Sequence, residues 1–451
     1  MLILTLLSIG GLIAGLLLLR TVPVVTAWPP TTSAQPSRTA ERPTNRALRS
    51  SSGLQPAVRR TQKKGALDAA EKLPNSAFRS SSGLQPAVSH AQEKGASAPG
   101  SPVTSADQPF SAAYTAPETC CLRSVQRLPS ITIIIPARNE ATNLPPLLES
   151  LRHSAIAPSQ ILAVDDGSTD NTSAIAIQHG ATVIASAPLP AGWTGKTWAC
   201  HQGALAATGD ALFFLDADTY FTPTGYTRIV EHFATLPPNT ALSLLPFHRT
   251  QLWYEELSLF FNILVAMGAG GFGKLDPPHL FGQSLLIPRD LYNQAGGHHS
   301  VKREILENLH FSELIRTANG IPATLSGRGT LEMRMFPDGL TQLRESWQKA
   351  FSTGAGVTSP LVLALSIYWL AAAMLTALLL AAIHNPLWST IATLYLLNAI
   401  QIAWYARQLG TFRWITALLY PIPLAFYFVT FAQSIWRQTR RQPVTWRGRQ
   451  L

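Results

Sequence analysis

Pairs of acidic residues directly follow two short apolar runs of this 451-residue chain, and this pattern restricts the fold more than any other feature. The first run, ILAV, leads into Asp165 and Asp166, and the second, ALFFL, leads into Asp216 and Asp218. Short continuous apolar runs are typical of strands that are buried on both faces of a sheet. Because ligands of α/β sheets bind at the carboxyl ends of the strands, we expect these carboxylates to lie in one cleft.

The residues around these two runs alternate between strand and helix patterns. Further β-branched or apolar runs occupy residues 131–136 and 181–186, and helical patterns occupy residues 143–154, 169–180 and 198–208. Strand–helix alternation with buried strands predicts a doubly wound α/β sheet. We expect it to form a catalytic domain over residues 129–356.

Both ends of the chain are apolar. Residues 2–19 are uncharged and just long enough to span a bilayer as a helix, which predicts an N-terminal transmembrane anchor over residues 1–22. A cleaved signal peptide is the alternative, but no basic residue precedes the run and no clear cleavage site follows it. Three more spans are expected at 360–383, 388–406 and 414–436, within a transmembrane region at 357–438. The charged fraction of only 13%, against about 25% in soluble domains, agrees with segments in lipid.

The third C-terminal segment raises a topological conflict. Five arginines between positions 437 and 449 favour a cytoplasmic tail at 439–451, on the same side as the catalytic domain. Three complete spans would instead leave the tail outside. Since Pro421 and Pro423 interrupt helical hydrogen bonding, we expect this segment to be re-entrant or interfacial. The predicted location is the cell (inner) membrane, multi-pass, with the catalytic domain in the cytoplasm.

Residues 23–128 are rich in Pro and Ser and contain a duplication: RSSSGLQPAV occurs at 49–58 and again at 79–88. Two copies without a periodic apolar face do not stack into a core, so a disordered linker is expected. The net charge of +10 arises largely from basic residues in this linker and in the C-terminal tail. Because both flank apolar runs, we expect a membrane as the partner and no nucleic acid.

The acidic residues and their neighbours indicate nucleotide chemistry. An Asp-x-Asp sequence at a strand end suits a ribose hydroxyl and a divalent ion, and Mg²⁺ or Mn²⁺ is the natural partner of a diphosphate. In the loop GWTGK, Lys196 precedes a helix and is predicted to meet a phosphate, unless it is simply a solvated lysine. Arg138 and Glu140 follow the first strand and are candidates to hold a base or ribose; a surface salt bridge is the alternative.

Together these residues carry a family resemblance. The segments IIPARNE, VDDGSTD, GKTWACHQGA and FLDAD resemble family 2 glycosyltransferases, which implies the GT-A type of doubly wound mixed sheet. Residues 131–451, with segments such as FGQSLLIPRDLYNQAGGHHSVK and VTWRGRQL, are similar to the bacterial carotenoid-acid branch of that family. Hopanoid-associated glycosyltransferases are near neighbours.

The resemblance implies roles for residues of the donor site. Asp166 would contact the uracil of a UDP-sugar, and Ala137 and Glu140 would line the uridine. Asp216 would bind the ribose and Asp218 the metal. Asp165 and Lys196 complete the expected nucleotide-sugar-binding set.

The resemblance also implies inversion at the anomeric carbon, which needs a general base for the acceptor hydroxyl. Many members carry a Glu-Asp pair at the corresponding position, where this chain has Glu307 and Asn308. Glu307 is therefore the candidate base; the alternative is a surface acid that pairs with Lys302 or Arg303.

Three residues are candidates for the acceptor site: Gln342, Trp347 and His298. Gln342 and Trp347 resemble part of the Gln-x-x-Arg-Trp signature of processive synthases, but Ser346 stands where the arginine would be, which favours a single transfer. Trp347 as a core residue is an open alternative. The apolar stretch 253–274 is predicted either to lie at the membrane interface and admit a lipid acceptor or to belong to the core.

The sequence thus predicts an inverting glycosyltransferase that moves a sugar, glucose from UDP-glucose, to a membrane lipid or carotenoid-acid acceptor. A hopanoid or polyprenyl-lipid glycosyltransferase with the same mechanism is the first alternative. A non-catalytic membrane scaffold with a decayed glycosyltransferase fold is the second.

Overall fold

The computed structural model describes residues 2–19, 23–25, 128–268, 272, 275, 277–304, 307–354, 359–381, 386–440, 445–446 and 449–450. Most of the predicted linker, including its duplication, lies outside these residues, as does most of the basic tail. Within the tail, the described residues are 439–440 and the short antiparallel pair of β11 (Thr445–Trp446) and β12 (Arg449–Gln450).

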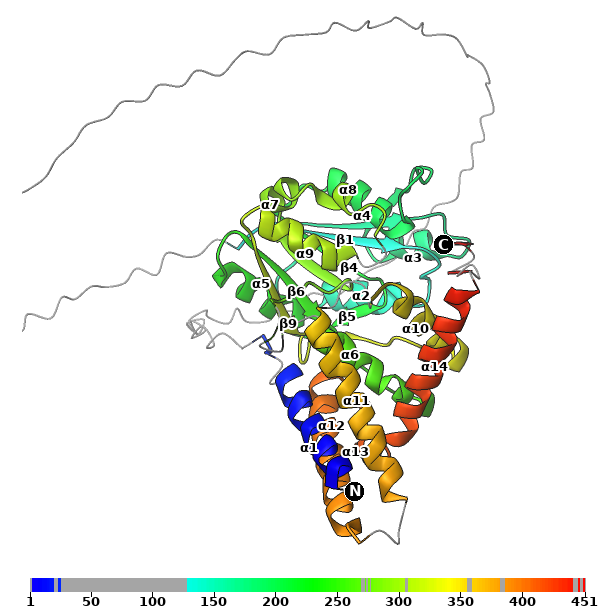
Figure 1. Cartoon of the computed structure of the whole chain (residues 1–451). Coiled ribbons are helices and arrows are strands. Elements are labelled where there is room, and N and C mark those ends of the chain that lie inside the picture. The colour runs from blue at the N-terminus through cyan, green and yellow to red at the C-terminus, as the bar shows by residue number, and fades with distance from the viewer. Residues whose placement is uncertain are drawn as a thin grey trace, which may run out of the picture. The chain divides into compact units, whose positions relative to one another are not determined.

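The centre of the molecule is a seven-stranded sheet with the strand order β3-β2-β1-β4-β8-β6-β9 (Figure 1). Strand β1 pairs in parallel with β2 and β4, and β2 with β3, whereas β8 runs antiparallel between β4 and β6. The predicted doubly wound mixed sheet is therefore confirmed. Its strands are β1 (Ile131–Ala137), β2 (Gln160–Asp165), β3 (Thr182–Ala185), β4 (Ala211–Leu215), β6 (Thr240–Leu245), β8 (Ser284–Pro288) and β9 (Ile321–Ser326).

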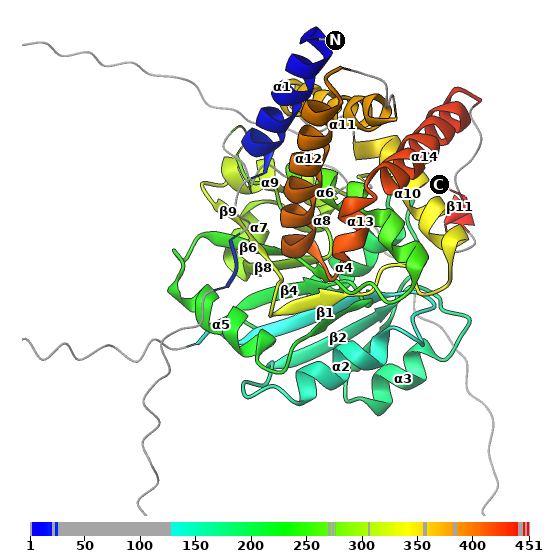
Figure 2. The same cartoon turned by 90° about the horizontal axis from the view of Figure 1, so that it is seen from below.

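Helices cover both faces of this sheet, because the strands are apolar on both sides. One face packs against α2 (Leu144–Arg152), α3 (Thr172–Gln178) and α5 (Gly225–Thr235), with α2 and α3 together beneath the sheet in Figure 2. The other face packs against α4 (Gly195–Ala206), α7 (Arg289–Gln294), α8 (Gly297–Ser300) and α9 (Glu307–Thr317). A second, smaller sheet consists of β5 (Thr219–Phe221), β10 (Leu331–Met333) and β7 (Phe247–His248). Its strand β5 follows directly after the Asp-x-Asp sequence.

A third apolar core lies in a helical bundle that packs beside the domain (Figure 1). Among the described residues, one helix, Pro360–Leu380, is long and apolar enough to cross a membrane by length and composition. The other predicted spans are a shorter apolar helix, a less apolar helix and a broken segment. The bundle consists of α1 (Leu2–Leu18), α6 (Leu259–Gly268), α10 (Leu340–Gly354), α11 (Pro360–Leu380), α12 (Trp388–Leu409), α13 (Trp414–Leu418) and α14 (Pro421–Thr439).

Helix α1 packs closely against α11. A Cβ atom on Gly11 would lie 2.2 Å from the Cβ of Ala372, so the helices touch where α1 has no side chain. Close contact through small residues is a characteristic packing mode of membrane helices. Two side chains of the bundle also donate hydrogen bonds to carbonyls of α1: Tyr368 Oη to Leu7 at 2.8 Å and Gln401 Nε2 to Leu12 at 2.9 Å. The N-terminal helix is thus an integral part of the bundle core.

The chain after α1 joins the edge of the large sheet. Val24 forms a parallel bridge with Ser326 of β9, and the Ser326 amide donates to the Pro23 carbonyl at 2.7 Å. Arg228 donates to the carbonyl of Val25, which is fully buried. Residues 23–25, expected in the linker, therefore belong to the folded domain.

The predicted third C-terminal span is broken, and the break lies next to its prolines. Helix α13 ends at Leu418 and α14 begins at Pro421, since a proline ring is accommodated in the first turn of a helix and not in its interior. Before the break the chain is held at the domain, where the Thr411 amide donates to the His248 carbonyl at 2.9 Å.

At the break the chain has moved deep into the bundle. Tyr395 Oη donates to the Leu418 carbonyl at 2.6 Å, and Tyr395 lies 14 residues before the end of α12, roughly 21 Å along that helix. Helix α14 then returns towards the domain: it packs against the 3-10 helix of residues Trp253–Ser258, which follows β7, and Ser434 Oγ donates to the carbonyl of Gln348 in α10 at 2.9 Å. Residues 411–439 thus form a hairpin that enters and leaves the bundle at its domain end.

The apolar stretch 253–274 forms the 3-10 helix η1 (Trp253–Ser258) followed by α6. Most side chains of α6 are buried in the bundle core, among them Phe260 and Phe261. Of the two predictions for this stretch, core burial holds for α6, which packs against α11, α12 and α14.

Candidate active site

A wide cleft opens at the carboxyl ends of β1, β2 and β4. It encloses about 570 Å³ of empty space, including its open mouth. Carboxylates from separate strands meet here, because parallel neighbours end at the same edge of the sheet. The lining residues are Pro136, Ala137, Arg138, Glu140, Asp166, Gly195, Lys196, Ala199, Asp216, Ala217 and Asp218.

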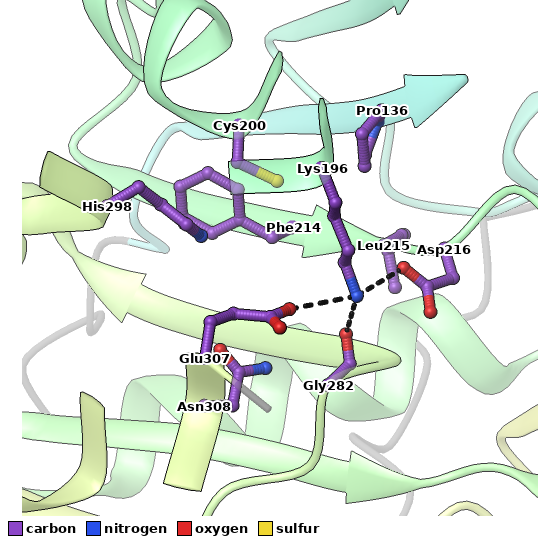
Figure 3. A pocket seen from close by; sticks show the side chains of 10 residues that line it. All are labelled: Pro136, Lys196, Cys200, Phe214, Leu215, Asp216, Gly282, His298, Glu307 and Asn308. Carbon is purple, nitrogen blue, oxygen red and sulfur yellow. Dashed lines mark hydrogen bonds and ion pairs between the residues drawn. The ribbon is translucent and has the colours of Figure 1, made fainter. Parts of the chain in front are cut away.

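A narrower pocket adjoins the cleft (Figure 3), with about 210 Å³ of empty space that includes its opening to solvent. Pro136, Lys196 and Asp216 line both cavities, so the two are neighbours with a shared wall. The remaining residues of the narrow pocket are Cys200, Phe214, Leu215, Gly282, His298, Glu307 and Asn308.

Lys196 stands at the junction of the two cavities. Helix α4 begins at Gly195, with Thr194 as its N-cap, and this start directs Lys196 inward. Its Nζ lies 2.8 Å from Asp216 Oδ1, 3.0 Å from Glu307 Oε1 and 2.7 Å from the Gly282 carbonyl. Three partners match the three donors of an ammonium group, so a phosphate would have to displace one of them.

The charge of Lys196 is secured by its partners. Burial lowers the pKa of Lys196, but the carboxylates of Asp216 and Glu307 outweigh this effect and hold the pKa above its usual value. The alternative of a solvated surface lysine is therefore wrong.

Glu307 opens α9 and is almost fully buried, with 5% of its side chain exposed against 29% for Lys196. Its partner in the structure is Lys196, and not Lys302 or Arg303 as in the surface-acid alternative. The next residue, Asn308, is also buried and donates from Nδ2 to the Phe281 carbonyl at 2.6 Å. The pair therefore presents one carboxylate and one amide to the narrow pocket.

His298 lies in the same pocket, on α8. Its Nδ1 is 2.9 Å from Tyr292 Oη, and the ring packs on Phe214 with centroids 4.6 Å apart. Burial, followed by the positive charge of Lys196, lowers the pKa of His298 to about 3. The imidazole is therefore neutral at pH 7.

The two acids that follow β2 differ in what they contact. Asp166 lines the cleft, and its carbonyl accepts a 2.8 Å hydrogen bond from Arg138 Nη1. Asp165 lines neither cavity: it accepts from the Ser168 amide at 2.8 Å and from the Ser173 hydroxyl. Burial raises the pKa of Asp165, but the hydrogen bonds from these donors lower it by more. The pKa of Asp165 therefore lies below its ordinary value. Asp165, expected in the nucleotide-sugar set, thus shapes the loop that presents Asp166.

Glu140 and Ala137 also line the cleft. Glu140 is held by its own loop, since its Oε2 accepts from Asn143 Nδ2 at 2.8 Å and its amide donates to Thr172 Oγ1 at 2.8 Å. A loop fixed in this way keeps the carboxylate at the cleft wall.

Two acceptor-site candidates lie elsewhere. Trp347 is buried in the bundle core, stacked on Phe261 with centroids 4.7 Å apart. Gln342, one turn into α10, exchanges hydrogen bonds with Asp338. Neither lines the cleft or the narrow pocket, because the apolar face of α10 turns towards the bundle. Of the two interpretations of Trp347, the core residue fits its position.

Five residues of the narrow pocket were not predicted from the sequence: Pro136, Cys200, Phe214, Leu215 and Gly282. Cys200 and Phe214 are ordinary core residues by pattern and become visible only when α4 is placed on the sheet. Gly282 lies two residues before β8, and a glycine shortly before a strand was the one signal available.

The donor groups present suit a divalent ion only together with a substrate. Among the described parts of the chain, no group of three or more His, Cys, Asp or Glu side chains is arranged to hold a metal. Asp218 nevertheless lines the cleft beside Asp216. Mg²⁺-type ions commonly bind through one or two carboxylates plus substrate phosphates, so these residues fit an ion that arrives with a diphosphate.

Comparisons with known proteins agree with this geometry. The model of glycosyl transferase family 2 matches residues 132–309. The chain is 33% identical over 332 residues to 4,4'-diaponeurosporenoate glycosyltransferase of Staphylococcus aureus strain MRSA252. The aligned region covers 71% of this chain and 88% of that relative. The enzyme of that name from strain USA300 is 32% identical over the same share.

Two solved structures are also similar. One is a mannosyltransferase of Pyrobaculum calidifontis in complex with GDP-Man and Mn²⁺, with 17% sequence identity and a TM-score of 0.44. The match covers 69% of this chain and 88% of that chain. The other is glucosyl-3-phosphoglycerate synthase of Mycobacterium tuberculosis with Mn²⁺, UDP and glucosyl-3-phosphoglycerate, at 20% identity, 51% of this chain, 82% of that chain and a TM-score of 0.35.

A family model that matches the strand-end acids, and a relative that extends the match across most of the chain, lead to one conclusion: the protein belongs to glycosyltransferase family 2.

Proposed function

We propose that the protein transfers a sugar from a UDP-sugar, glucose from UDP-glucose, to a carotenoid acid or similar membrane lipid, with inversion at the anomeric carbon. The observation that carries this proposal is the pair of adjoining cavities joined at Lys196 and Asp216. A wide cleft suits a nucleotide, and a narrow pocket with a buried carboxylate suits the attacking group of an acceptor.

In the cleft, Asp166 would hydrogen-bond the uracil, with Ala137 and Glu140 along the uridine. Asp216 would bind the ribose, and Asp218 would hold Mg²⁺ or Mn²⁺. The ion, when bound, supplies positive charge against the diphosphate leaving group. Lys196 adds a fixed positive charge at the same wall, in a site partly shielded from water where such charges act strongly.

In the narrow pocket, Glu307 would take the proton of an acceptor hydroxyl as the acceptor oxygen attacks the anomeric carbon. Lys196 keeps the Glu307 carboxylate turned towards the junction with the cleft, at 3.0 Å. His298, neutral and fixed by Tyr292, would accept or donate one hydrogen bond without adding charge. A carboxylic acid acceptor would arrive already ionised and would depend less on Glu307.

The bundle supports a membrane location, with the catalytic domain on the cytoplasmic side. Helix α12 has 22 residues, roughly 33 Å, close to the hydrocarbon thickness of about 30 Å. Trp388 is exposed at its far end, and Trp253, Trp414 and Trp436 are exposed near its domain end, as in the aromatic belts of membrane proteins. Large apolar side chains also point outward between these levels, among them Ile3, Leu6, Ile13, Leu361, Ile367, Leu378, Leu396 and Ile400.

The hairpin of residues 411–439 supports the same topology. With α1, α11 and α12 as spans, a hairpin that returns to the domain end leaves the arginine-rich tail on the cytoplasmic side, in agreement with the positive-inside rule.

The test is transfer by membranes that contain the full-length protein. UDP-[¹⁴C]glucose and Mn²⁺ are supplied with extracted carotenoid acids, and the products are identified by mass spectrometry. We expect a hexose adduct with the wild type and at least a hundredfold loss with Asp218→Ala, since Asp218 would hold the metal. An adduct on hopanoid or polyprenyl lipids alone would transfer the assignment to that acceptor class. UDP binding without any transfer would favour the scaffold alternative.

A further inference from the structure

Gly282 is a gap in the wall of the narrow pocket. A Cβ atom at this position would lie 3.7 Å from Lys196 Nζ, 3.8 Å from Glu307 Oε1 and 4.0 Å from Asn308 Nδ2. These are ordinary contact distances, and the φ angle of Gly282 lies outside the left-handed region. The backbone therefore does not require glycine here. What the missing side chain provides is space among three polar groups.

The residue before this gap belongs to the bundle core. Phe281 is buried in the apolar cluster of the bundle, stacked with Phe272 at a centroid distance of 5.8 Å. Its carbonyl accepts the Asn308 amide, and the next carbonyl, that of Gly282, accepts Lys196. Within two residues the chain passes from an apolar core to a polar pocket. An acceptor with a long apolar body and a polar end would meet surroundings that change in the same order.

We propose that Gly282 makes room for the polar end of an apolar acceptor and thereby selects acceptors whose reacting end is a single slim group, a hydroxyl or a carboxyl. This proposal rests on the proposed glycosyl transfer and names the acceptor class of that same site. Gly282 acts here as a specificity-determining residue.

The chemistry of the pocket fits such an end group. Glu307 accepts a hydrogen bond, and the Lys196 ammonium attracts an oxygen. Cys200, Phe214 and Leu215 close the inner wall, so little polar surface remains for a second sugar ring (Figure 3). A sugar ring presents several hydroxyls, and each would need a partner once removed from water.

The experiment compares Gly282→Ala and Gly282→Val with the wild type, all as full-length protein in membranes. Transfer of glucose from UDP-glucose is measured with farnesol and with retinoic acid as acceptors, and the Kd of UDP with Mn²⁺ is measured in parallel. When the acceptor occupies the pocket, the extra methyl group of Gly282→Ala is expected to lower kcat/KM for both acceptors roughly tenfold, mainly by raising KM. Gly282→Val is expected to lower kcat/KM further. UDP affinity should stay within about twofold of the wild type, which also shows that the variants fold.

Asp166→Ala is the reciprocal control, because Asp166 lines the cleft and not the pocket. It should weaken UDP binding and leave the KM of the acceptor nearly unchanged. Wild-type transfer to a farnesyl glycoside as readily as to farnesol would overturn the proposed selection, as would unchanged transfer by Gly282→Val beside an inactive Asp218→Ala. Absence of transfer by the wild type to every acceptor would instead overturn the proposed function, and this assignment with it.

Discussion

The cleft and the bundle are held together in different ways. Where the cleft meets the narrow pocket, one cation, Lys196, joins two carboxylates that lie 91 residues apart in the sequence, Asp216 and Glu307. In the bundle, polar side chains such as Tyr368 and Gln401 bond to backbone carbonyls of neighbouring helices, and shape at Gly11 sets the distance between helices. The cleft therefore depends on the identity of single charged groups, whereas the bundle depends on volume.

The largest expected effect lies in the narrow pocket beside the cleft. Glu307→Gln keeps the size of the side chain and removes its charge, so transfer to a hydroxyl acceptor should fall by roughly a hundredfold or more in kcat. The rate is measured at saturating UDP-glucose. Glu304→Gln is the matched control, because Glu304 is 41% exposed and pairs with His310 at the surface. Full turnover by Glu307→Gln would show that the base assignment is wrong.

A volume change should act on the bundle. In Gly11→Leu the new side chain would overlap Ala372, which overpacks the contact between α1 and α11 and should cost about 1–3 kcal/mol of stability. Ile13→Leu, at a position 54% exposed, should change stability by less than about 0.5 kcal/mol. Thermal unfolding in detergent measures both. Equal Tm values for the two variants would contradict the packing of α1, and loss of UDP binding at low temperature would contradict the independence of the two regions.

The most gradual effect concerns acid stability, to which both regions contribute. Burial lowers the pKa of His298 in the pocket to about 3 and that of His248 at the junction with the bundle to about 4. Both values lie below the unfolded value of about 6.5, so the unfolded state binds protons first as the pH falls. The stability from each neutral histidine is fully present above about pH 6.5 and declines as the pH falls below that value.

The decline should continue to about pH 3 for His298 and about pH 4 for His248. Denaturant titrations between pH 7 and pH 4 measure it, and His298→Gln should show a shallower slope than the wild type. A wild-type stability that is constant across this range would refute the buried neutral state of both histidines.

The fold could be predicted from the sequence to the extent that its signals are local. Buried strands read as apolar runs. Pro421 and Pro423, with the arginines of the tail, predicted a re-entrant or interfacial segment where the structure has the hairpin of residues 411–439. The sequence did not show which of two neighbouring residues of the same type lines the cleft. Asp165 and Asp166 look alike in the sequence, but only the hydrogen bonds of Ser168 and Ser173 decide that Asp165 turns into its loop.

Positions that depend on how distant elements pack were out of reach. Trp347 lies on a helix whose apolar face is evident, but the sequence does not say whether that face meets a cleft or a core. Gly282 matters because of three side chains that come from α4 and α9. The importance of such positions depends on which side chains surround them in the folded protein, and the sequence alone does not give those neighbours.

The contacts of α1 have a consequence for biosynthesis. Its hydrogen-bonding partners Tyr368 and Gln401 follow 361 and 389 residues after the atoms they bind. At about 5–20 residues per second, the ribosome needs roughly 20–80 s to deliver them. During that interval the surface of α1 around Gly11 has no helix to pack against. Helix α1 is therefore synthesised well before its packing partners in the bundle.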